Sequence, residues 1–480
     1  MENSAPIVAA MKKYSADRVL AFHTPGHKQG RGAHEFLREL LTAEGLRQEV
    51  SLMEELDDLH EPRSCIKKAQ ELAARLWHAD ECLFMVNGTT SAIQAMIFGT
   101  LKPGDLIMIP RNAHRSVISG LILSGATPIF LPVEFDAEFN LPLNVSVETI
   151  ERAIKKFPQA RAVLLVSPNY YGVAADLEKI SELVHSAGMI LLIDEAHGAH
   201  LYFSDKLPAA AMDSGADLAA QSTHKLLGAL TQSSMLMLRK KFSERVKIAA
   251  SLLQTTSPNQ ILLASLDIAR LQMEQSPQKI SEAVALAEKL RAGIKKFRGL
   301  KTFDDAGNFQ LDTTKVTVNV QTLGLTGQEA EKILRRELKV QCELSDAANL
   351  LFLITYADTS ATIAKLLDAL KILSQRSQGK FPSPSPILTQ EIISAELSPR
   401  ETFYSAVEVV PLKKSVGRIC AEEITFYPPG IPLLMPGEKI SAQVIEQIER
   451  GKILGGRIIG AADKNLLTLK VTSSEVIHTN

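Results

Sequence analysis

Alternation of short apolar runs with segments of helical spacing is the feature that most restricts how this 480-residue chain can fold. The apolar runs have the length of buried strands, and they are Asp105–Pro110, Pro128–Val133, Arg161–Val166, Met189–Asp194, Asp217–Gln221 and Ser234–Leu238. The segments between the first four runs have apolar residues at helical spacing, and they are 113–124, 146–157 and 176–187. Strand and helix in regular alternation predict an α/β fold whose mainly parallel sheet is covered by helices on both faces.

The length of the chain allows two or three domains at roughly 150 residues each. We expect an N-terminal arm over 1–60 and a large sheet-containing domain over 61–275. Strand and helix patterns continue beyond it and predict a smaller α/β domain over 276–380. The segment Arg376–Pro386 is rich in Ser, Pro and Gly and is the best linker candidate. A further C-terminal domain is then expected over 381–480.

The composition excludes several classes of protein. The 53 basic and 54 acidic residues give a net charge of −1, so there is no electrostatic reason to expect a nucleic-acid or anionic-membrane partner. The four cysteines are too few for a disulfide scaffold and too far apart for a zinc site, and we expect no metal. The N-terminus lacks the pattern of a signal peptide, and no apolar run is long enough to span a membrane. We therefore expect a cytoplasmic protein.

A lysine in the segment Ala220–Ala229 is the first candidate catalytic residue. Lys225 follows a predicted strand and the sequence Ser222-Thr-His224, and small residues come after it. A lysine amine can form a Schiff base with a carbonyl carbon when it is accessible and can lose its proton. A solvated surface residue is the ordinary alternative for any single lysine, so the neighbouring motifs decide between the two.

An aspartate ends one of the predicted strands. Asp194 closes the apolar run Met189–Asp194, and in open α/β sheets the ligand crevice lies outside such strand ends. A buried carboxylate needs a cationic partner. The protonated ring nitrogen of pyridoxal 5'-phosphate (PLP) is such a partner. Asp194 taken alone could equally bind a metal or cap a helix.

Two further motifs favour a PLP site. Within Val86–Ala95, Gly88 and three hydroxyl residues precede a helical pattern, which suits a phosphate group but is also an ordinary capping sequence. His114 follows another predicted strand and could stack on a flat ring or simply lie near a helix start. A phosphate-type loop, a histidine, a buried aspartate and a lysine in this order favour PLP. The chain has no Walker or dinucleotide-binding motif, so nucleotide-binding folds gain no support.

The run Ser222–Ser234 resembles the PLP-attachment signature of the Orn/Lys/Arg decarboxylase family, and the resemblance extends over nearly the whole chain. The other motifs that carry it are Phe22–Lys28, Asp57–His60, Asn87–Ser91, Arg111–His114, Tyr171–Leu177, Asp194–Gly198, Tyr427–Pro432 and Pro436–Glu438. The resemblance implies a fold-type-I, aspartate-aminotransferase-like PLP domain with smaller C-terminal α+β domains. It also implies a homodimer or higher homo-oligomer. Because the chain begins almost directly at these motifs, we expect it to lack the extra N-terminal domain of the large acid-stress members.

The resemblance also implies roles for individual residues. Lys225 would carry PLP through a Schiff base, Asp194 would pair with the ring nitrogen, and His114 and Ala196 would pack on the two faces of the ring. The residues implied to hold the phosphate are Thr90, Ser91, Ser222 and His224. His197 lies where some members carry an aromatic residue, and we expect it to contact the cofactor in a role that stays open.

The implied reaction is decarboxylation of a basic amino acid. We expect arginine as the substrate, giving agmatine and CO₂ for polyamine biosynthesis, because the compact chain resembles biosynthetic arginine decarboxylases. The alternatives are lysine or ornithine, giving cadaverine or putrescine, and also an aminotransferase or a non-catalytic PLP-fold protein. A cationic side chain calls for a carboxylate partner. The candidate substrate-binding residues are Glu438, Glu423, Glu422 and His23, with Glu343 and Asp346 as further acids.

Overall fold

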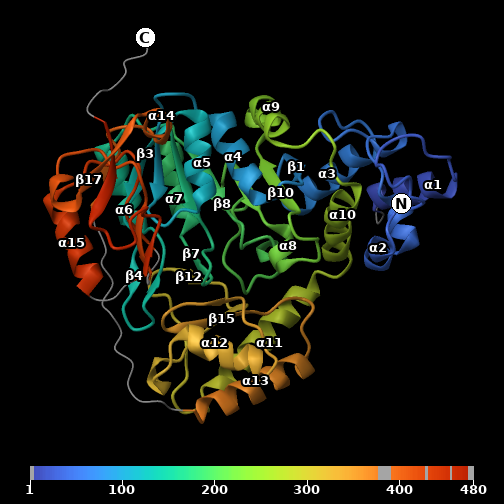
Figure 1. Cartoon of the computed structure of the whole chain (residues 1–480). Helices are drawn as coiled ribbons and strands as arrows, with labels where there is room; N and C mark the ends of the chain where they lie inside the picture. The colour runs from blue at the N-terminus through green and yellow to red at the C-terminus, as the bar shows by residue number, and fades with distance from the viewer. Residues whose placement is uncertain (1–4, 377–390, 428–430, 454–456, 474–480) are drawn as a thin grey trace. The chain divides into compact units, whose positions relative to one another are not determined.

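The computed structural model describes residues 5–376, 391–427, 431–453 and 457–473 (Figure 1). Most of the predicted linker Arg376–Pro386 and part of the motif Tyr427–Pro432 lie outside these ranges. The chain divides into two compact units. Unit 1 comprises Met1–Thr100, Ile193–Asp205 and Ala209–Ile280, and unit 2 comprises Leu101–Leu192, Lys206–Pro208 and Ser281–Asn480.

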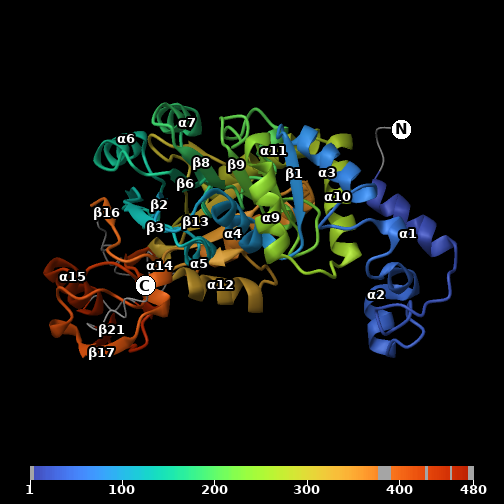
Figure 2. The same ribbon diagram turned by 90° about the horizontal axis from the view of Figure 1, so that it is seen from above.

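Unit 1 contains three antiparallel strands and the helices that pack on them. The strand β10 (Ser234–Leu238) pairs with β1 (Glu81–Met85) on one side and with β9 (Leu218–Gln221) on the other. All residues of β9 and β10 are buried, which agrees with their continuous apolar sequences. The helices of this unit are α1 (Pro6–Ala16), α2 (Glu35–Gln48), α3 (Cys65–Leu76), α4 (Gly88–Thr100), α8 (Thr223–Leu226), α9 (Ser243–Leu253) and α10 (Gln260–Gln275). Helices α3, α4 and α9 contact the strands (Figure 2).

Unit 2 contains the parallel part of the fold. The strand β2 (Leu106–Pro110) pairs in parallel with β3 (Thr127–Leu131) and with β6 (Ala162–Val166). The next strand in the order is β8 (Ile190–Asp194), whose last two residues belong to unit 1. The crossover helices are α5 (Arg115–Ser124), α6 (Val147–Lys156) and α7 (Leu177–Ser186). Figure 2 shows α6 and α7 on one face of these strands and α5 on the other.

The α/β fold predicted from the alternating pattern is confirmed. The predicted strands and crossover helices agree with the structure to within two residues at each end. The agreement is close because each strand is short and mostly apolar, and each helix is bounded by turn or capping residues. Gly125, for example, adopts a left-handed conformation with φ 75° at the end of α5, which a residue with a side chain rarely adopts.

A second layered structure follows in unit 2. Its strands β11 (Lys301–Thr302), β13 (Lys315–Asn319), β15 (Asn349–Leu353) and β14 (Leu344–Ser345) form one antiparallel sheet in that order. Its helices are α11 (Gln278–Ile294), α12 (Gly327–Arg336) and α13 (Ser360–Ser374), which Figure 1 shows beside β15. Apolar side chains from the sheet and all three helices form a separate core. The short strands β4 (Phe135–Asp136), β5 (Leu141–Pro142), β7 (Val173–Ala174) and β12 (Gln310–Leu311) form two small ribbons.

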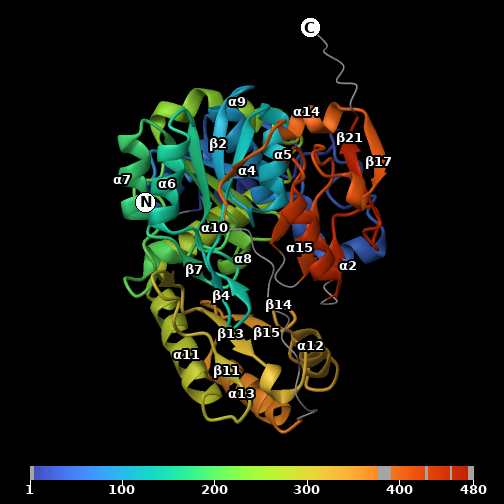
Figure 3. The same cartoon turned by 90° about the vertical axis from the view of Figure 1, so that its left-hand side faces the viewer.

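The C-terminal part of unit 2 has a core of its own. It contains α14 (Pro399–Tyr404), α15 (Ala442–Ile453), the paired strands β17 (Val407–Pro411) and β21 (Thr468–Thr472), and the three-stranded sheet of β19 (Pro432–Leu434), β18 (Ile424–Tyr427) and β20 (Arg457–Ile459). Figure 3 shows β17 and β21 side by side. Both C-terminal cores lie inside the ranges 276–380 and 381–480, but the four-domain division stays a prediction. No helix in the described ranges is both long and apolar enough to cross a membrane.

A buried ion pair joins the C-terminal part to the parallel sheet within unit 2. Arg111, which follows β2, donates from both Nη atoms to the carboxylate of Glu438, at 2.9 and 2.6 Å. The two side chains are 2% and 3% exposed. The guanidinium also lies 4.9 Å from the ring centre of Phe130 on β3. A second tie is β16 (Ile393–Ser394), which pairs antiparallel with β3.

We predict that Glu438→Gln destabilises unit 2 strongly, because it leaves the Arg111 guanidinium buried without a counter-charge. The loss should be about 3–5 kcal/mol, and the double variant Arg111→Met, Glu438→Met should recover much of it. Urea denaturation of Glu438→Gln and of the double variant measures the two losses, and the single variants Arg111→Met and Glu438→Met complete the cycle that gives the coupling. A Glu438→Gln protein as stable as the wild type would show that the pair contributes nothing.

Candidate active site

Asp194 ends β8 in a fully buried position. The side chain is 3% exposed, and its Oδ1 accepts a hydrogen bond from the backbone N–H of Ala196 at 3.1 Å. No lysine or arginine in the described part of the chain forms an ion pair with it. Burial raises the pKa of Asp194 to about 6, although the Ala196 N–H and the charge of Lys225 both act to lower it. The carboxylate therefore has no ion-pair partner among the described residues, and the charge of Lys225 offsets its burial only in part.

Lys225 lies on α8, the short helix that follows β9. Its side chain is half-buried, and its Nζ lies 2.8 Å from Nε2 of His197. His197 is 2% exposed and comes three residues after Asp194, in the loop that leaves β8. The amine predicted to react, the buried aspartate and His197 thus all lie in unit 1.

The hydroxyl-rich loop lies at the start of α4. Thr89 is buried, and its hydroxyl is 2.6 Å from Oγ of Ser222 and 2.7 Å from Oγ of Ser234. Ser91 is buried and donates to the carbonyl of Gly88 at 2.9 Å, whereas Thr90 is exposed. The helix start thus lies against Ser222, and the first backbone N–H groups of a 13-residue helix favour an anion. Sequence reasoning selected Thr90 and Ser91 and missed Thr89.

His224 is the remaining predicted phosphate ligand. Its ring is half-buried, and Nδ1 lies 2.8 Å from the carbonyl oxygen of Ser233. This contact is consistent with an Nδ1–H donor, so Nε2 can donate to a phosphate only when the ring carries both protons. Its role toward a phosphate group stays a prediction.

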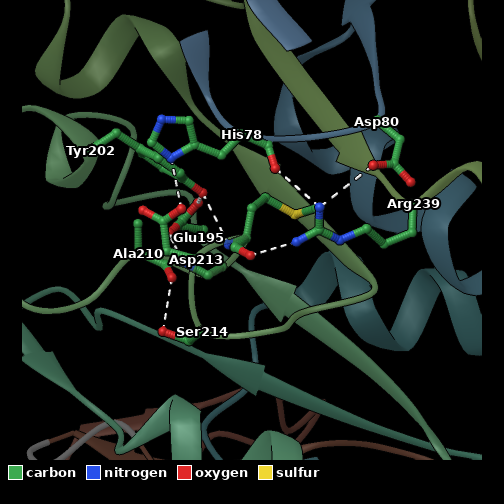
Figure 4. Close-up of polar contacts among 10 residues, drawn as sticks. His78, Asp80, Glu195, Tyr202, Ala210, Asp213, Ser214 and Arg239 are labelled. Atoms are coloured by element: carbon green, nitrogen blue, oxygen red, sulfur yellow. Dashed lines mark hydrogen bonds and ion pairs between the residues drawn. The ribbon is translucent and has the colours of Figure 1, made fainter. Parts of the chain in front are cut away.

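Glu195 forms a polar network that sequence reasoning did not find (Figure 4). Its carboxylate is fully buried and accepts hydrogen bonds from Nε2 of Gln221 at 2.6 Å, the N–H of Ala211 at 2.7 Å and the hydroxyl of Tyr202 at 3.0 Å. The Tyr202 hydroxyl in turn accepts the N–H of Met212 at 3.2 Å. Burial raises the pKa of Glu195 to about 7, and these donors act against the shift. Adjacent strand residues face opposite sides, so a second acid after Asp194 was the available signal.

Charged side chains that are more exposed than Glu195 lie at the edge of this network. His78 Nδ1 lies 2.7 Å from Oδ1 of Asp213, and the guanidinium of Arg239 lies 3.6 Å from Asp80 (Figure 4). Arg239 also donates to the carbonyl oxygen of His78 at 3.0 Å. The network holds the chain after β8 and the segment after Ala209 in fixed positions relative to β9.

His114 belongs to unit 2, where it caps α5. Its Nδ1 accepts a hydrogen bond from the N–H of Ser116 at 3.3 Å and lies 2.8 Å from the Ser116 hydroxyl. The ring is exposed, which agrees both with stacking on a flat cofactor ring and with a simple position near a helix start. The stacking role of His114 therefore stays a prediction, as does that of Ala196.

Several candidate substrate-binding acids have both oxygens engaged inside the protein. Glu438 binds Arg111 and the N–H of Met435, and Glu422 accepts the backbone N–H groups of Ala462 and Lys470, each at 2.7 Å. Asp346 accepts the Tyr171 hydroxyl at 2.7 Å and two backbone N–H groups. These contacts give each acid a structural role.

The remaining candidates are less enclosed. Glu423 is half-buried and accepts the hydroxyl of Thr425 at 2.7 Å. Glu343 is exposed. His23 lies in unit 1, with Nε2 2.9 Å from the Tyr14 hydroxyl and Nδ1 2.6 Å from the Thr24 carbonyl. No group of three or more His, Cys, Asp or Glu side chains able to hold a metal occurs among the described residues.

A family model described as the major domain of Orn/Lys/Arg decarboxylases matches residues 5–319. The model of the C-terminal domain of the same decarboxylases matches residues 387–450. The chain belongs to this family. The resemblance carried by the lysine motif is thereby confirmed, together with the prediction of a decarboxylase.

Relatives within the family differ in how similar their sequences are to this chain. The arginine decarboxylase of Bacillus subtilis is 38% identical over 484 residues, covering 99% of each chain. The inducible lysine decarboxylase of Escherichia coli is 24% identical, covering 91% of this chain and 75% of its own. The crystal structure of the Francisella novicida lysine decarboxylase LdcF superposes with a TM-score of 0.83 at 22% identity, covering 98% of this chain and 81% of its own. PLP fold-type-I enzymes are also among the structural neighbours, which confirms the predicted fold type.

We predict that the two buried acids make the cofactor-free protein less stable as the pH rises from about 4 to about 7. Their folded-state pKa values, about 6 for Asp194 and about 7 for Glu195, lie above those of the unfolded chain. The stability that they contribute is therefore complete below the unfolded pKa and is lost as the pH rises through the folded pKa. Urea denaturation of Asp194→Asn should show a flatter pH dependence, by on the order of 3 kcal/mol over this range. Equal slopes for variant and wild type would contradict the assignment.

Proposed function

We propose that this protein is a PLP-dependent arginine decarboxylase that forms agmatine and CO₂. The observation that carries the proposal is the arrangement of Asp194 and Lys225: a buried carboxylate that forms no ion pair with a described residue, and a half-buried amine whose charge lowers the pKa of that carboxylate. The family to which the chain belongs supports decarboxylation. The Bacillus subtilis and Bacillus anthracis relatives named arginine decarboxylase, at 38% and 39% identity, support arginine as the substrate.

The residues of unit 1 fit PLP. Asp194 offers a carboxylate to a cationic ring nitrogen, and the start of α4 with Thr90, Ser91, Ser222 and His224 offers N–H and side-chain donors to a phosphate. Lys225 offers the amine for covalent attachment. His114 and Ala196 are proposed to pack on the ring. When bound, PLP supplies an electron sink for the electrons of the broken bond between Cα and the carboxylate.

The chain contributes positioning and proton control. Asp194 would keep the ring nitrogen of bound PLP protonated, because a nearby anion favours the cationic form. Burial of this carboxylate excludes water and strengthens the interaction. Lys225 and His197 are the proton-carrying side chains in contact with each other beside Asp194. Glu195, locked by its three donors, holds the end of β8 on which Asp194 lies.

A carboxylate must also receive the guanidinium of arginine, and a planar guanidinium favours a bidentate acid. Glu423 is proposed for this role ahead of Glu422, Glu438 and Asp346, whose oxygens are engaged by internal donors. We further propose a cytoplasmic homodimer or higher homo-oligomer, in agreement with the family resemblance. The neutral composition supports a small-molecule substrate rather than a nucleic acid.

We predict that Lys225→Ala lowers the rate of CO₂ release by on the order of 10³-fold or more, because the protein loses its covalent link to the cofactor. Circular dichroism should show an intact fold. Lys155→Ala, which alters an exposed lysine of α6, is the control and should retain the wild-type rate. Near-wild-type decarboxylation by Lys225→Ala would overturn the proposed active site.

We predict that arginine is the preferred substrate, with kcat/KM at least about tenfold above that of lysine or ornithine, on the scale of losing one charge-assisted hydrogen bond. Separate incubation with the three amino acids, followed by mass spectrometry of the amine product, measures this preference. Agmatine should dominate. Dominant cadaverine or putrescine would retain the decarboxylase and reject the substrate, whereas a keto acid in place of CO₂ would indicate an aminotransferase.

A further inference from the structure

The Lys225–His197 contact is a direct side-chain hydrogen bond between two segments far apart in the chain. The 2.8 Å distance joins Nζ of Lys225 to Nε2 of His197. His197 lies in the loop after β8, and Lys225 lies on α8, after β9. The amine to which we assign covalent attachment of PLP therefore contacts a ring nitrogen directly.

The two segments are held in place by contacts independent of the pair. The N–H of Glu195 donates to the carbonyl of Ala220 at 3.0 Å, and the N–H of Gly198 donates to the carbonyl of Glu195 at 2.8 Å. The Glu195 side chain binds Gln221, the last residue of β9, at 2.6 Å. These bonds lie on both sides of His197 and immediately before α8, so the short distance between Nζ and Nε2 is supported by the surrounding backbone.

The contact restricts the protonation of the pair. Nζ can donate to Nε2 only when Nε2 carries no proton, and Nε2–H can donate to Nζ only when the amine is neutral. A hydrogen bond therefore exists when one proton is shared, and it is lost when ammonium and imidazolium face each other. The other titratable groups beside the pair on these segments are Asp194 at the end of β8, Glu195 and His200 in the loop after it, and His224 on α8.

We propose that His197 is the proton-exchange partner of Lys225 and controls how fast this lysine attaches the cofactor. This inference rests on the proposed role of Lys225. The ammonium of Lys225 transfers one proton to Nε2 of His197, which frees the nitrogen lone pair. The lone pair then forms the C–N bond with the aldehyde carbon of PLP, and the aldehyde oxygen leaves.

The step is balanced in atoms and protons. The ammonium carries three protons, and two of them leave with the aldehyde oxygen as water. The third remains shared between His197 and the lysine nitrogen, now doubly bonded to carbon. No oxidant or reductant takes part. A histidine suits this exchange because its ordinary pKa lies close to neutral pH, so that it accepts and returns a proton readily.

The main experiment compares His197→Gln with the wild type as full-length proteins stripped of cofactor. Glutamine can accept a hydrogen bond from the lysine but cannot take up its proton. We expect PLP uptake, followed by the change in visible absorbance after mixing, to be at least tenfold slower in the variant at neutral pH. Its rate should rise only at more alkaline pH, where the lysine loses its proton to solvent.

A second measurement does not need the cofactor. Acetic anhydride modifies only the free amine, and peptide mass spectrometry gives the extent of modification at Lys225. In the wild type the rate of modification should rise at lower pH than in His197→Gln. His185→Gln, which changes an exposed histidine on α7, is the matched control and should behave as the wild type. Added imidazole should speed PLP uptake by His197→Ala, and this variant also serves if His197→Gln does not fold.

Two results would overturn the inference. One is PLP uptake by His197→Gln at the wild-type rate and with the wild-type pH profile. The other is slower uptake with an unchanged pH profile of Lys225 modification, which would assign His197 a packing role only. Failure of the proposed function is distinct, because it appears as absent CO₂ release from all three amino acids or as absence of PLP attachment to wild-type Lys225.

Discussion

Two adjacent buried carboxylates at the end of β8 set the conditions for the whole site. Asp194 is the last residue of β8 and Glu195 follows it, and their carboxylates accept hydrogen bonds from different groups. Glu195 meets three hydrogen-bond donors and fixes the chain after β8 to β9. Among the described residues, Asp194 accepts one backbone N–H and lies near the charge of Lys225 without forming an ion pair. A buried anion without a counter-charge is costly, and it is retained where a ligand supplies the missing charge. Glu195 therefore holds the end of β8 in the position from which Asp194 can bind a cationic ring.

The position of Lys225 also depends on the contacts that hold β9, α8 and the start of α4 together. Lys225 lies three residues beyond Ser222, and Ser222 is tied to the start of α4 through Thr89. One short helix thus lies next to both the anion-binding helix start and the loop that carries His197. The strand β9 ends at Gln221, a few residues before Lys225, and this short connection places the lysine next to His197. In the proposed function, the reactivity of Lys225 depends on where its proton goes, and we propose the neighbouring imidazole of His197 as the acceptor.

Sequence alone predicted the strands and crossover helices because short apolar runs and their capping residues are local signals. It also selected Asp194 and Lys225, since a strand end and a lysine after a second strand each have a recognisable pattern. Glu195 was not found, because its role depends on Tyr202 and Ala211, which reach it only after the chain folds back. Thr89 was missed for a similar reason: its partner Ser234 lies on β10, 145 residues away. Contacts between distant segments leave no local periodicity.

The motifs that resemble the family signature contain residues with a structural role and residues proposed for chemistry. The hydrogen bonds and ion pairs that each side chain forms distinguish the two kinds. Arg111 and Glu438 neutralise each other in the interior of unit 2, and Glu422 is engaged by two backbone N–H groups. The charges of these groups are already compensated by partners inside the protein, so they serve the architecture. Asp194 is equally buried but forms no ion pair with a described residue, and for this reason we propose it as a cofactor-binding residue. The net charge of −1 does not distinguish paired from unpaired buried charges, because it is only a count of charged residues. The functional charges of this chain are those that the fold buries and does not neutralise.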